Sequence, residues 1–198
     1  MTLANRLTWL RIILAPVFFA VYFLPEMFGG RFFSIAPWTI PALWIIAIIA
    51  EFTDMFDGMA ARHQNEVSDF GKFFDPFADT LFQITAFLCF VIAGLFPPAL
   101  FLVVIYREYG ILFIRNLLLK KGIALGARKS GKLKTVIYIT AGGIALLYKS
   151  LIRLSAFESF QPTIRIIAVI AFYISVAFAV ISFFDYYLFY RKANKTKS

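Results

Sequence analysis

The sequence has little of what a water-soluble protein or a transition-metal site needs. Only 16% of its 198 residues are charged, against about a quarter in an average soluble domain. A single cysteine excludes an internal disulfide bond and a cysteine-based zinc site, and a single histidine excludes a histidine cluster. Side-chain ligands for a metal ion are therefore limited to the oxygen atoms of Asp and Glu.

What the chain has instead is hydrophobicity and positive charge. Apolar residues make up 61% of the sequence, and the mean hydropathy is +0.80. A chain this apolar is not disordered, and the composition predicts an integral membrane protein. The 20 Lys and Arg exceed the 11 Asp and Glu, which gives a formal net charge of +9. That charge suits anionic lipid or phosphate, and the hydrophobicity favours these partners over nucleic acid.

Six stretches are apolar over the length of roughly 20 residues that a spanning helix needs. The alternation typical of outer-membrane barrel strands is absent from the sequence. We therefore expect an all-α membrane protein, with residues 1–198 forming one domain of about six transmembrane helices. The stretches lie near Leu7–Leu24, Pro37–Met55, Gly71–Leu95, Pro98–Leu119, Val136–Ile152 and Ile164–Tyr190.

Positive charge is distributed unevenly among the connections. Lys and Arg gather between the fourth and fifth stretches and in the C-terminal tail, whereas the connection after the first stretch carries only Arg31. The positive-inside rule then predicts that both termini lie in the cytosol, together with the second-to-third and fourth-to-fifth connections.

Four aspartates interrupt the apolar pattern of the second and third stretches. An aspartate at the centre of an inserting helix costs roughly 2.5–3.5 kcal/mol, so such residues are candidates for a functional site. Asp54 and Asp57 are three positions apart, and Asp75 and Asp79 are four apart, so each pair shares one helix face. Four carboxylates without histidine or cysteine suit a hard cation such as Mg²⁺, Mn²⁺ or Ca²⁺.

The residues next to these aspartates also favour a binding site. Gly58, Ala61 and Gly71 are small residues that let a ligand or a facing helix approach closely. Arg62 is placed to meet a phosphate that shares the cation. Ion pairing or helix capping is the alternative explanation, but Arg62 and Lys72 are the only basic residues nearby in the sequence.

These residues resemble a family signature. They fill every fixed position of the pattern D-x2-D-G-x2-A-R-x8-G-x3-D-x3-D, which is typical of CDP-alcohol phosphatidyltransferases. The resemblance implies a homodimeric six-helix membrane enzyme, with a polar cavity that opens to the cytosol. In a bacterium it would lie in the cytoplasmic (inner) membrane. The residues at the fixed positions are Asp54, Asp57, Gly58, Ala61, Arg62, Gly71, Asp75 and Asp79.

The same resemblance implies a role for each residue. An alcohol attacks the lipid-bearing phosphorus of CDP-diacylglycerol, and CMP leaves. Asp54, Asp57 and Asp75 would bind Mg²⁺ or Mn²⁺, and Asp79, also close to the metal, would act as the general base. The residues expected to contact the CDP-lipid are Thr8, Gly58, Ala61, Arg62 and Gly71.

Three weaker motifs resemble the phosphatidylglycerophosphate synthase branch of that family. They are the opening segment Asn5–Pro16, the pair Arg107-Glu108 followed by Arg115, and Gly131–Thr135, which reads G-K-x-K-T. Glycerol 3-phosphate would then be the acceptor. The residues expected to bind its phosphate are Arg107, Arg115, Lys132 and Lys134.

Several alternatives stay open from the sequence. Arg107 and Glu108 could equally form a structural ion pair. Thr80 stands where the branch usually has lysine, so cardiolipin, phosphatidylserine and phosphatidylinositol-phosphate synthases remain alternatives. A divalent-cation transporter is the alternative from a different class, since intramembrane carboxylates serve both uses. A transporter, however, has no need for Arg62 one turn from its metal ligands.

Overall fold

The long apolar stretches form helices, because a helix satisfies its own backbone hydrogen bonds where no water is available. The computed structural model describes residues 3–27, 36–64, 69–123 and 129–195, with side chains for 6–27, 36–53, 74–123 and 130–193. No strand occurs within these ranges, and a short 3₁₀ turn at Glu158–Phe160 precedes the last helix. The helices are α1 (Leu3–Met27), α2 (Ala36–Gln64), α3 (Asp69–Ile92), α4 (Pro98–Lys120), α5 (Lys129–Arg153) and α6 (Gln161–Lys195).

Each of the six predicted stretches coincides with one helix, so the all-α prediction and the helix number are confirmed. The largest difference is that α2 continues to Gln64, well past the predicted end at Met55. The added segment is polar, but it is rich in Met, Ala, Arg and Gln, which favour a helix whether or not it is buried in lipid. The aspartate motif of the second stretch therefore lies within a helix.

Five stretches in the described residues are long and apolar enough to cross a membrane, and α4 contributes none of them. Any 18-residue window of α4 contains Arg107, Glu108 and Arg115. Arg107 and Glu108 are nevertheless buried, because they point into the bundle rather than outward. The fourth predicted stretch is thus a helix that carries the charges of Arg107 and Glu108 inside the bundle. The five stretches are Arg6–Met27, Ala36–Thr53, Phe74–Ile92, Ser130–Arg153 and Glu158–Ala193.

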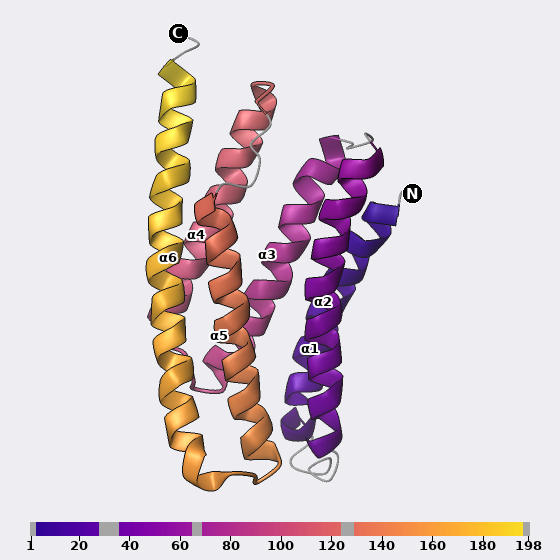
Figure 1. Ribbon diagram of the computed structural model, residues 1–198, viewed down its shortest axis with the longest axis vertical. Coiled ribbons are helices and arrows are strands. Elements are labelled where there is room, and N and C mark those ends of the chain that lie inside the picture. The colour runs from indigo at the N-terminus through magenta and orange to yellow at the C-terminus, as the bar shows by residue number, and fades with distance from the viewer. Residues whose placement is uncertain (1–2, 28–35, 65–68, 124–128, 196–198) are drawn as a thin grey trace.

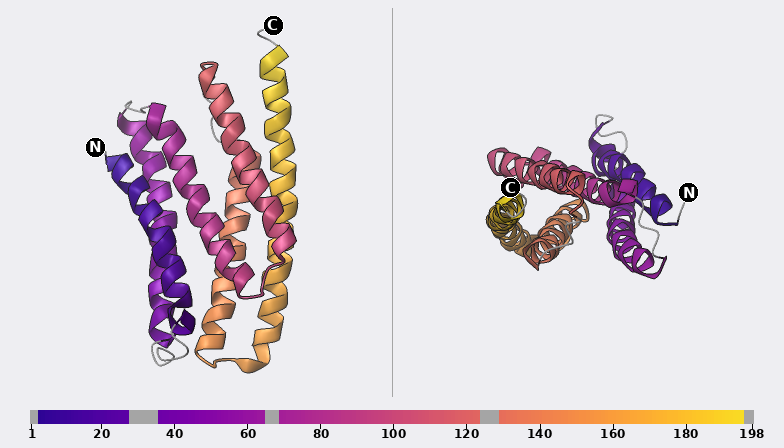
Figure 2. Two further views of the ribbon diagram at one scale, coloured as in Figure 1. Left: turned by 180° about the vertical axis from the view of Figure 1, so that it is seen from behind. Right: turned by 90° about the horizontal axis from the view of Figure 1, so that it is seen from above.

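The helices form two groups that share α3 as the connection. On one side α1 packs against α2 and α3, and on the other α6 packs against α5 and α4. Seen from above, α3 and α4 lie along one flank of the bundle, with α2 and α5 on the other (Figure 2). The end at which α1 begins and α6 ends is the upper end in Figure 1. We call it the motif end, because α2 ends and α3 begins there too.

Aromatic rings fill the core in the half of the bundle towards the α3–α4 connection. Phe96 stacks on Phe172 with ring centroids 4.0 Å apart, and Phe87 meets both rings edge-on at 5.8 and 5.5 Å. Edge-to-face and offset stacks of this kind add to the gain from burying apolar area. This packing fixes α3 and the α3–α4 connection against α6, and so it holds the helix that carries Asp75 and Asp79.

Candidate active site

Asp75 and Asp79 lie one turn apart on α3, and both side chains are partly buried. The hydroxyl of Thr8 on α1 donates a hydrogen bond to Oδ1 of Asp75. Thr8 is fully buried, and the neighbouring rings of Trp9 and Phe74 pack 5.1 Å apart. Thr8, predicted to contact the CDP-lipid, thus contacts a predicted metal ligand and orients its carboxylate.

Asp79 is linked to α5 through a residue that the sequence analysis did not single out. The amide Nε2 of Gln83 donates to Asp79 Oδ1 over 3.3 Å. The Oε1 atom of the same amide accepts from Lys134 Nζ, also over 3.3 Å. The predicted base and a predicted phosphate-binding lysine are therefore separated by a single side chain.

Lys134 belongs to a buried ionic cluster, which we define as Arg107, Glu108 and Lys134. Glu108 accepts from Lys134 Nζ over 3.1 Å and from Arg107 Nη1 over 2.7 Å. Arg107 also donates to Ser182 Oγ on α6 over 2.7 Å, and Lys134 lies 4.2 Å from the centre of the Tyr138 ring. The Arg107–Glu108 ion pair, considered as the structural alternative, is therefore present.

The other two predicted phosphate ligands are arranged differently. Arg115 donates to the hydroxyl of Tyr186 over 3.2 Å, and its guanidinium lies 5.6 Å from the centre of that ring. Lys132 is exposed whereas Lys134 is buried, because two residues along a helix turn the side chain by about 200°. The four basic residues are thus not brought into one cluster in this structure.

The glycine of the G-K-x-K-T segment has a packing role. A Cβ atom at Gly131 would lie 2.8 Å from the Tyr186 hydroxyl oxygen, closer than real Cβ contacts allow. Tyr186 is almost fully buried and bound to Arg115, so it has little room to move away. Gly131 therefore lets α5 approach α6 closely at the motif end.

The structure also gives a partner to Asp185, for which the sequence offered no account. Ser130 Oγ donates to Asp185 Oδ2 over 2.6 Å, which joins the start of α5 to α6. These two residues are 55 positions apart in the sequence, so no local spacing could have paired them. Gln83 had a weak local signal, since it lies one turn after Asp79 in an otherwise apolar stretch.

The remaining motif residues lie outside the described side chains. The helical backbone of α2 carries the first half of the motif and that of α3 the second, on either side of the α2–α3 connection (Figure 1). In the described part of the chain no three Asp, Glu, His or Cys side chains come together. The meeting of the four carboxylates stays a prediction. The residues concerned are Asp54, Asp57, Gly58, Ala61, Arg62 and Gly71.

The part of the site that is described fits a hard divalent cation. Asp75 and Asp79 supply carboxylate oxygens from one helix face. Thr8 and Gln83, which donate hydrogen bonds to them, are neutral and orient the oxygens without carrying a charge of their own. Oxygen ligands with this kind of outer support suit Mg²⁺ or Mn²⁺ better than a metal that prefers sulfur or nitrogen.

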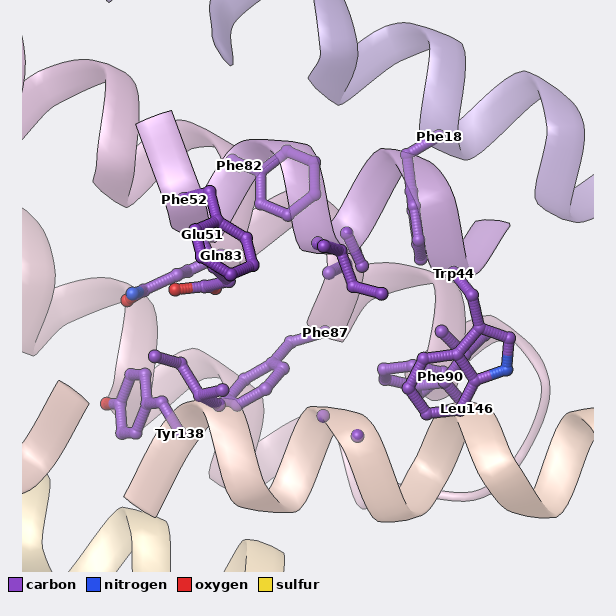
Figure 3. Close-up of a pocket in the computed structure, with 16 residues that line it drawn as sticks. Phe18, Trp44, Glu51, Phe52, Phe82, Gln83, Phe87, Phe90, Tyr138 and Leu146 are labelled. Carbon is purple, nitrogen blue, oxygen red and sulfur yellow. The ribbon is translucent and has the colours of Figure 1, made fainter. Parts of the chain in front are cut away.

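A cavity of about 230 Å³ lies between α2, α3 and α5. In Figure 3 the polar groups of Glu51 and Gln83 lie together at one end, and Trp44 and Leu146 lie at the other. Most of the lining is aromatic or aliphatic. The predicted polar cavity stays a prediction, because half of the acidic motif lies outside the described side chains.

The chain is similar to known proteins over most of its length. A family model described as CDP-alcohol phosphatidyltransferase matches residues 1–181. A CDP-diacylglycerol–glycerol-3-phosphate 3-phosphatidyltransferase of Treponema pallidum is 37% identical over 198 residues, which cover 94% of this chain and 88% of that protein. The protein of the same name from Bacillus subtilis is 32% identical over 200 residues, covering 99% and 98%. A probable phosphatidylglycerophosphate synthase of Mycobacterium tuberculosis is 34% identical over 145 residues, covering 73% and 66%.

Proposed function

The chain belongs to the CDP-alcohol phosphatidyltransferase family, and from that premise we propose that it transfers the phosphatidyl group of CDP-diacylglycerol to sn-glycerol 3-phosphate. The products are phosphatidylglycerol phosphate and CMP, so the enzyme acts in phospholipid biosynthesis. Near-full-length relatives named for this reaction are the observation that carries the choice of acceptor. As a phosphatidyltransferase of the EC 2.7.8 type it is an enzyme, which sets the cation transporter aside.

The proposed reaction assigns the proton to Asp79. The acceptor hydroxyl oxygen forms a bond to the lipid-bearing phosphorus of the CDP-lipid, and the bond from that phosphorus to the CMP oxygen breaks. CMP leaves with the electron pair, and the hydroxyl proton passes to the Asp79 carboxylate. Gln83 holds one oxygen of this carboxylate, which limits its rotation during the transfer.

Members of this family are generally metal-dependent, and we propose Mg²⁺ or Mn²⁺ for this chain. Asp54, Asp57 and Asp75 would hold the cation, with Asp79 close by. When bound, the metal neutralises charge on the diphosphate and on the leaving CMP. Thr8 would fix the Asp75 carboxylate from the α1 side, as an outer partner of a metal ligand.

The substrates would be held by separate groups. Arg62, with Gly58, Ala61 and Gly71, would contact the CDP moiety. The acceptor phosphate would bind at the buried ionic cluster, to Arg107 and Lys134, whereas Arg115 binds Tyr186 and Lys132 lies exposed on another face of α5. Glu108 neutralises only one of the two cations beside it, so the buried ionic cluster keeps one net positive charge for an anion.

The apolar cavity suits the lipid part of the donor. Its volume of about 230 Å³ is below the roughly 300–1,000 Å³ of pockets that enclose a whole drug-sized ligand. It therefore has room for part of an acyl chain rather than for a complete lipid. With the chain in the apolar end, the head group would emerge past Glu51 and Gln83 (Figure 3). Gln83 in turn binds Asp79.

The protein is an integral membrane protein, since several of its helices are long and apolar enough to span a bilayer. We propose that it lies in the bacterial cytoplasmic membrane among membrane lipids, as a homodimer. Both termini and the active site would face the cytosol, because the basic residues gather at the motif end. Glycerol 3-phosphate, being water-soluble, would then reach the site from the cytosol.

Release of CMP by the purified protein tests the proposal. The protein is given CDP-diacylglycerol, Mg²⁺ or Mn²⁺, and in turn glycerol 3-phosphate, serine, inositol phosphate and phosphatidylglycerol. We expect turnover with glycerol 3-phosphate and none with the other acceptors. Turnover with another acceptor alone would move the chain to a different branch, and no turnover with any of them would contradict the proposed activity.

A further inference from the structure

Gln83 is a buried amide whose two ends are used by charged partners. Its Nε2 donates to Asp79 and its Oε1 accepts from Lys134, each over 3.3 Å. A carboxylate can only accept and an ammonium can only donate, so the two ends of the amide cannot exchange places. The side chain is 6% exposed, and its orientation is therefore fixed by the groups that it joins.

These two hydrogen bonds complete a chain that crosses the bundle. From Gln83 it continues to Lys134 on α5, then to Glu108 and Arg107 on α4. It ends at Ser182 on α6. The acid on α3 is thereby connected to three other helices through buried polar groups, each held by the next.

The position of Gln83 also borders the cavity between α2, α3 and α5. Figure 3 shows its amide beside Glu51 at the polar end of that cavity. One side chain therefore touches the carboxylate proposed as the base, the ammonium proposed to bind the acceptor phosphate, and the space proposed for the donor lipid. A residue between the two proposed substrate regions is well placed to set the distance between them.

We propose that Gln83 is a positioning residue, which holds the Asp79 carboxylate and the Lys134 ammonium at a fixed separation. The inference rests on the proposed function, in which one acceptor carries both a hydroxyl and a phosphate on a three-carbon backbone. Its hydroxyl must meet Asp79 while its phosphate meets the cation. A rigid spacer between the two protein groups keeps the bound acceptor near the geometry of attack.

Q83M is the decisive variant, because methionine keeps the length of the side chain and removes both hydrogen bonds. We expect kcat to fall about 10- to 100-fold, as for the loss of other outer partners of reacting groups. The KM for glycerol 3-phosphate should rise, whereas the KM for CDP-diacylglycerol should change less than about twofold. In a K134M background, Q83M should no longer raise the KM for glycerol 3-phosphate, because the partner through which it acts is gone.

Q161M is the matched control. Gln161 also uses its amide to bridge two groups, the carbonyl oxygens of Leu151 and Ala156, at the end of the bundle away from the motif. It should retain wild-type kcat and KM. Q83E is the second variant if Q83M does not fold: it keeps an acceptor for Lys134, removes the donor to Asp79, and should also lose kcat.

The outcomes separate the two proposals. An active wild type together with a Q83M or Q83E protein of unchanged kcat overturns the positioning role alone. Equal losses in Q83M and Q161M also overturn it, since they would reflect general destabilisation. A wild type that releases no CMP with glycerol 3-phosphate overturns the proposed function, and the role of Gln83 with it.

Discussion

Both ends of the bundle contain one glutamate bound to one lysine and one arginine, but the two clusters differ in burial. At the motif end, Glu108 binds Arg107 and Lys134, and the exposed fractions of these side chains are only 5–6%. At the far end Glu26 binds Lys149 over 3.0 Å and Arg153 over 3.3 Å, and its side chain is 47% exposed. The far cluster also joins three helices, since Arg153 donates to Thr39 Oγ1 on α2 over 2.8 Å.

The difference in burial indicates that the two ion-pair clusters serve different purposes. A partly exposed ion pair contributes about 0–1 kcal/mol and serves mainly to tie helix ends together. Burying charges costs several kcal/mol per ion, which their attraction only partly offsets. An apolar cluster would fill the space around Glu108 at lower cost. The buried ionic cluster is therefore better explained by its link to Asp79 than by stability.

The largest expected difference between the two ends concerns Asp79, the proposed base, which Gln83 joins to the buried ionic cluster. D79N removes the proton acceptor, and turnover should fall by at least about 100-fold. Binding of CDP-diacylglycerol should be largely kept, because asparagine has the same shape. E26Q at the far end should leave the rate of CMP release unchanged. A D79N enzyme with the wild-type rate would show that another group takes the proton.

Removing the shared anion from each cluster should give unequal losses of stability. E108Q leaves two buried cations without their carboxylate, and we expect a loss of about 3–5 kcal/mol in the free energy of unfolding. For E26Q the expected loss is about 1 kcal/mol or less. Thermal unfolding in detergent, followed by circular dichroism, measures both. Equal losses would mean that the difference in burial has no energetic consequence.

Thr8 and Thr39 allow the next comparison. Thr8 binds a charged group at the motif end, and Thr39 binds one at the far end. T8V removes the donor to Asp75, and the Mn²⁺ concentration for half-maximal activity should rise about 10-fold. T39V removes the acceptor of Arg153 and should leave the metal requirement as in the wild type. A T8V enzyme with an unchanged metal requirement would exclude Thr8 as an outer support of the site.

The smallest effect is expected for the lysines. K134A should raise the KM for glycerol 3-phosphate about tenfold, the contribution of one hydrogen bond to a charged group, and raise that for CDP-diacylglycerol less. K149A should change neither, because Lys149 binds Glu26 at the far end. The two KM values, measured on the same preparations, decide this. Equal increases for both substrates would remove Lys134 from the acceptor site.

The helices and the acidic motif could be predicted from the sequence because both depend on local spacing. Asp75 and Asp79 share a helix face, as a separation of four residues requires. The same periodicity should have separated Lys132 from Lys134, which lie on different faces of α5. Grouping them as one cradle followed the motif and not the helix geometry.

The partners of these groups could not be predicted, because they come from distant parts of the chain. Gln83 meets Lys134 across 51 residues, and Arg107 meets Ser182 across 75. Glu108 could be paired with Arg107 from adjacency, but no local pattern indicates that it also binds Lys134. Long-range pairing of this kind depends on how helices cross, which local patterns do not encode.

The close approach at Gly131 has a consequence for how mutational scans of this enzyme should be interpreted. An added methyl group there would clash with the Tyr186 hydroxyl and displace α5. Lys134, one turn further along α5, would move with the helix. Activity would then be lost although no group that touches a substrate had changed. A scan that scored only activity would count Gly131 as a ligand contact, when its contribution is to the alignment of two helices.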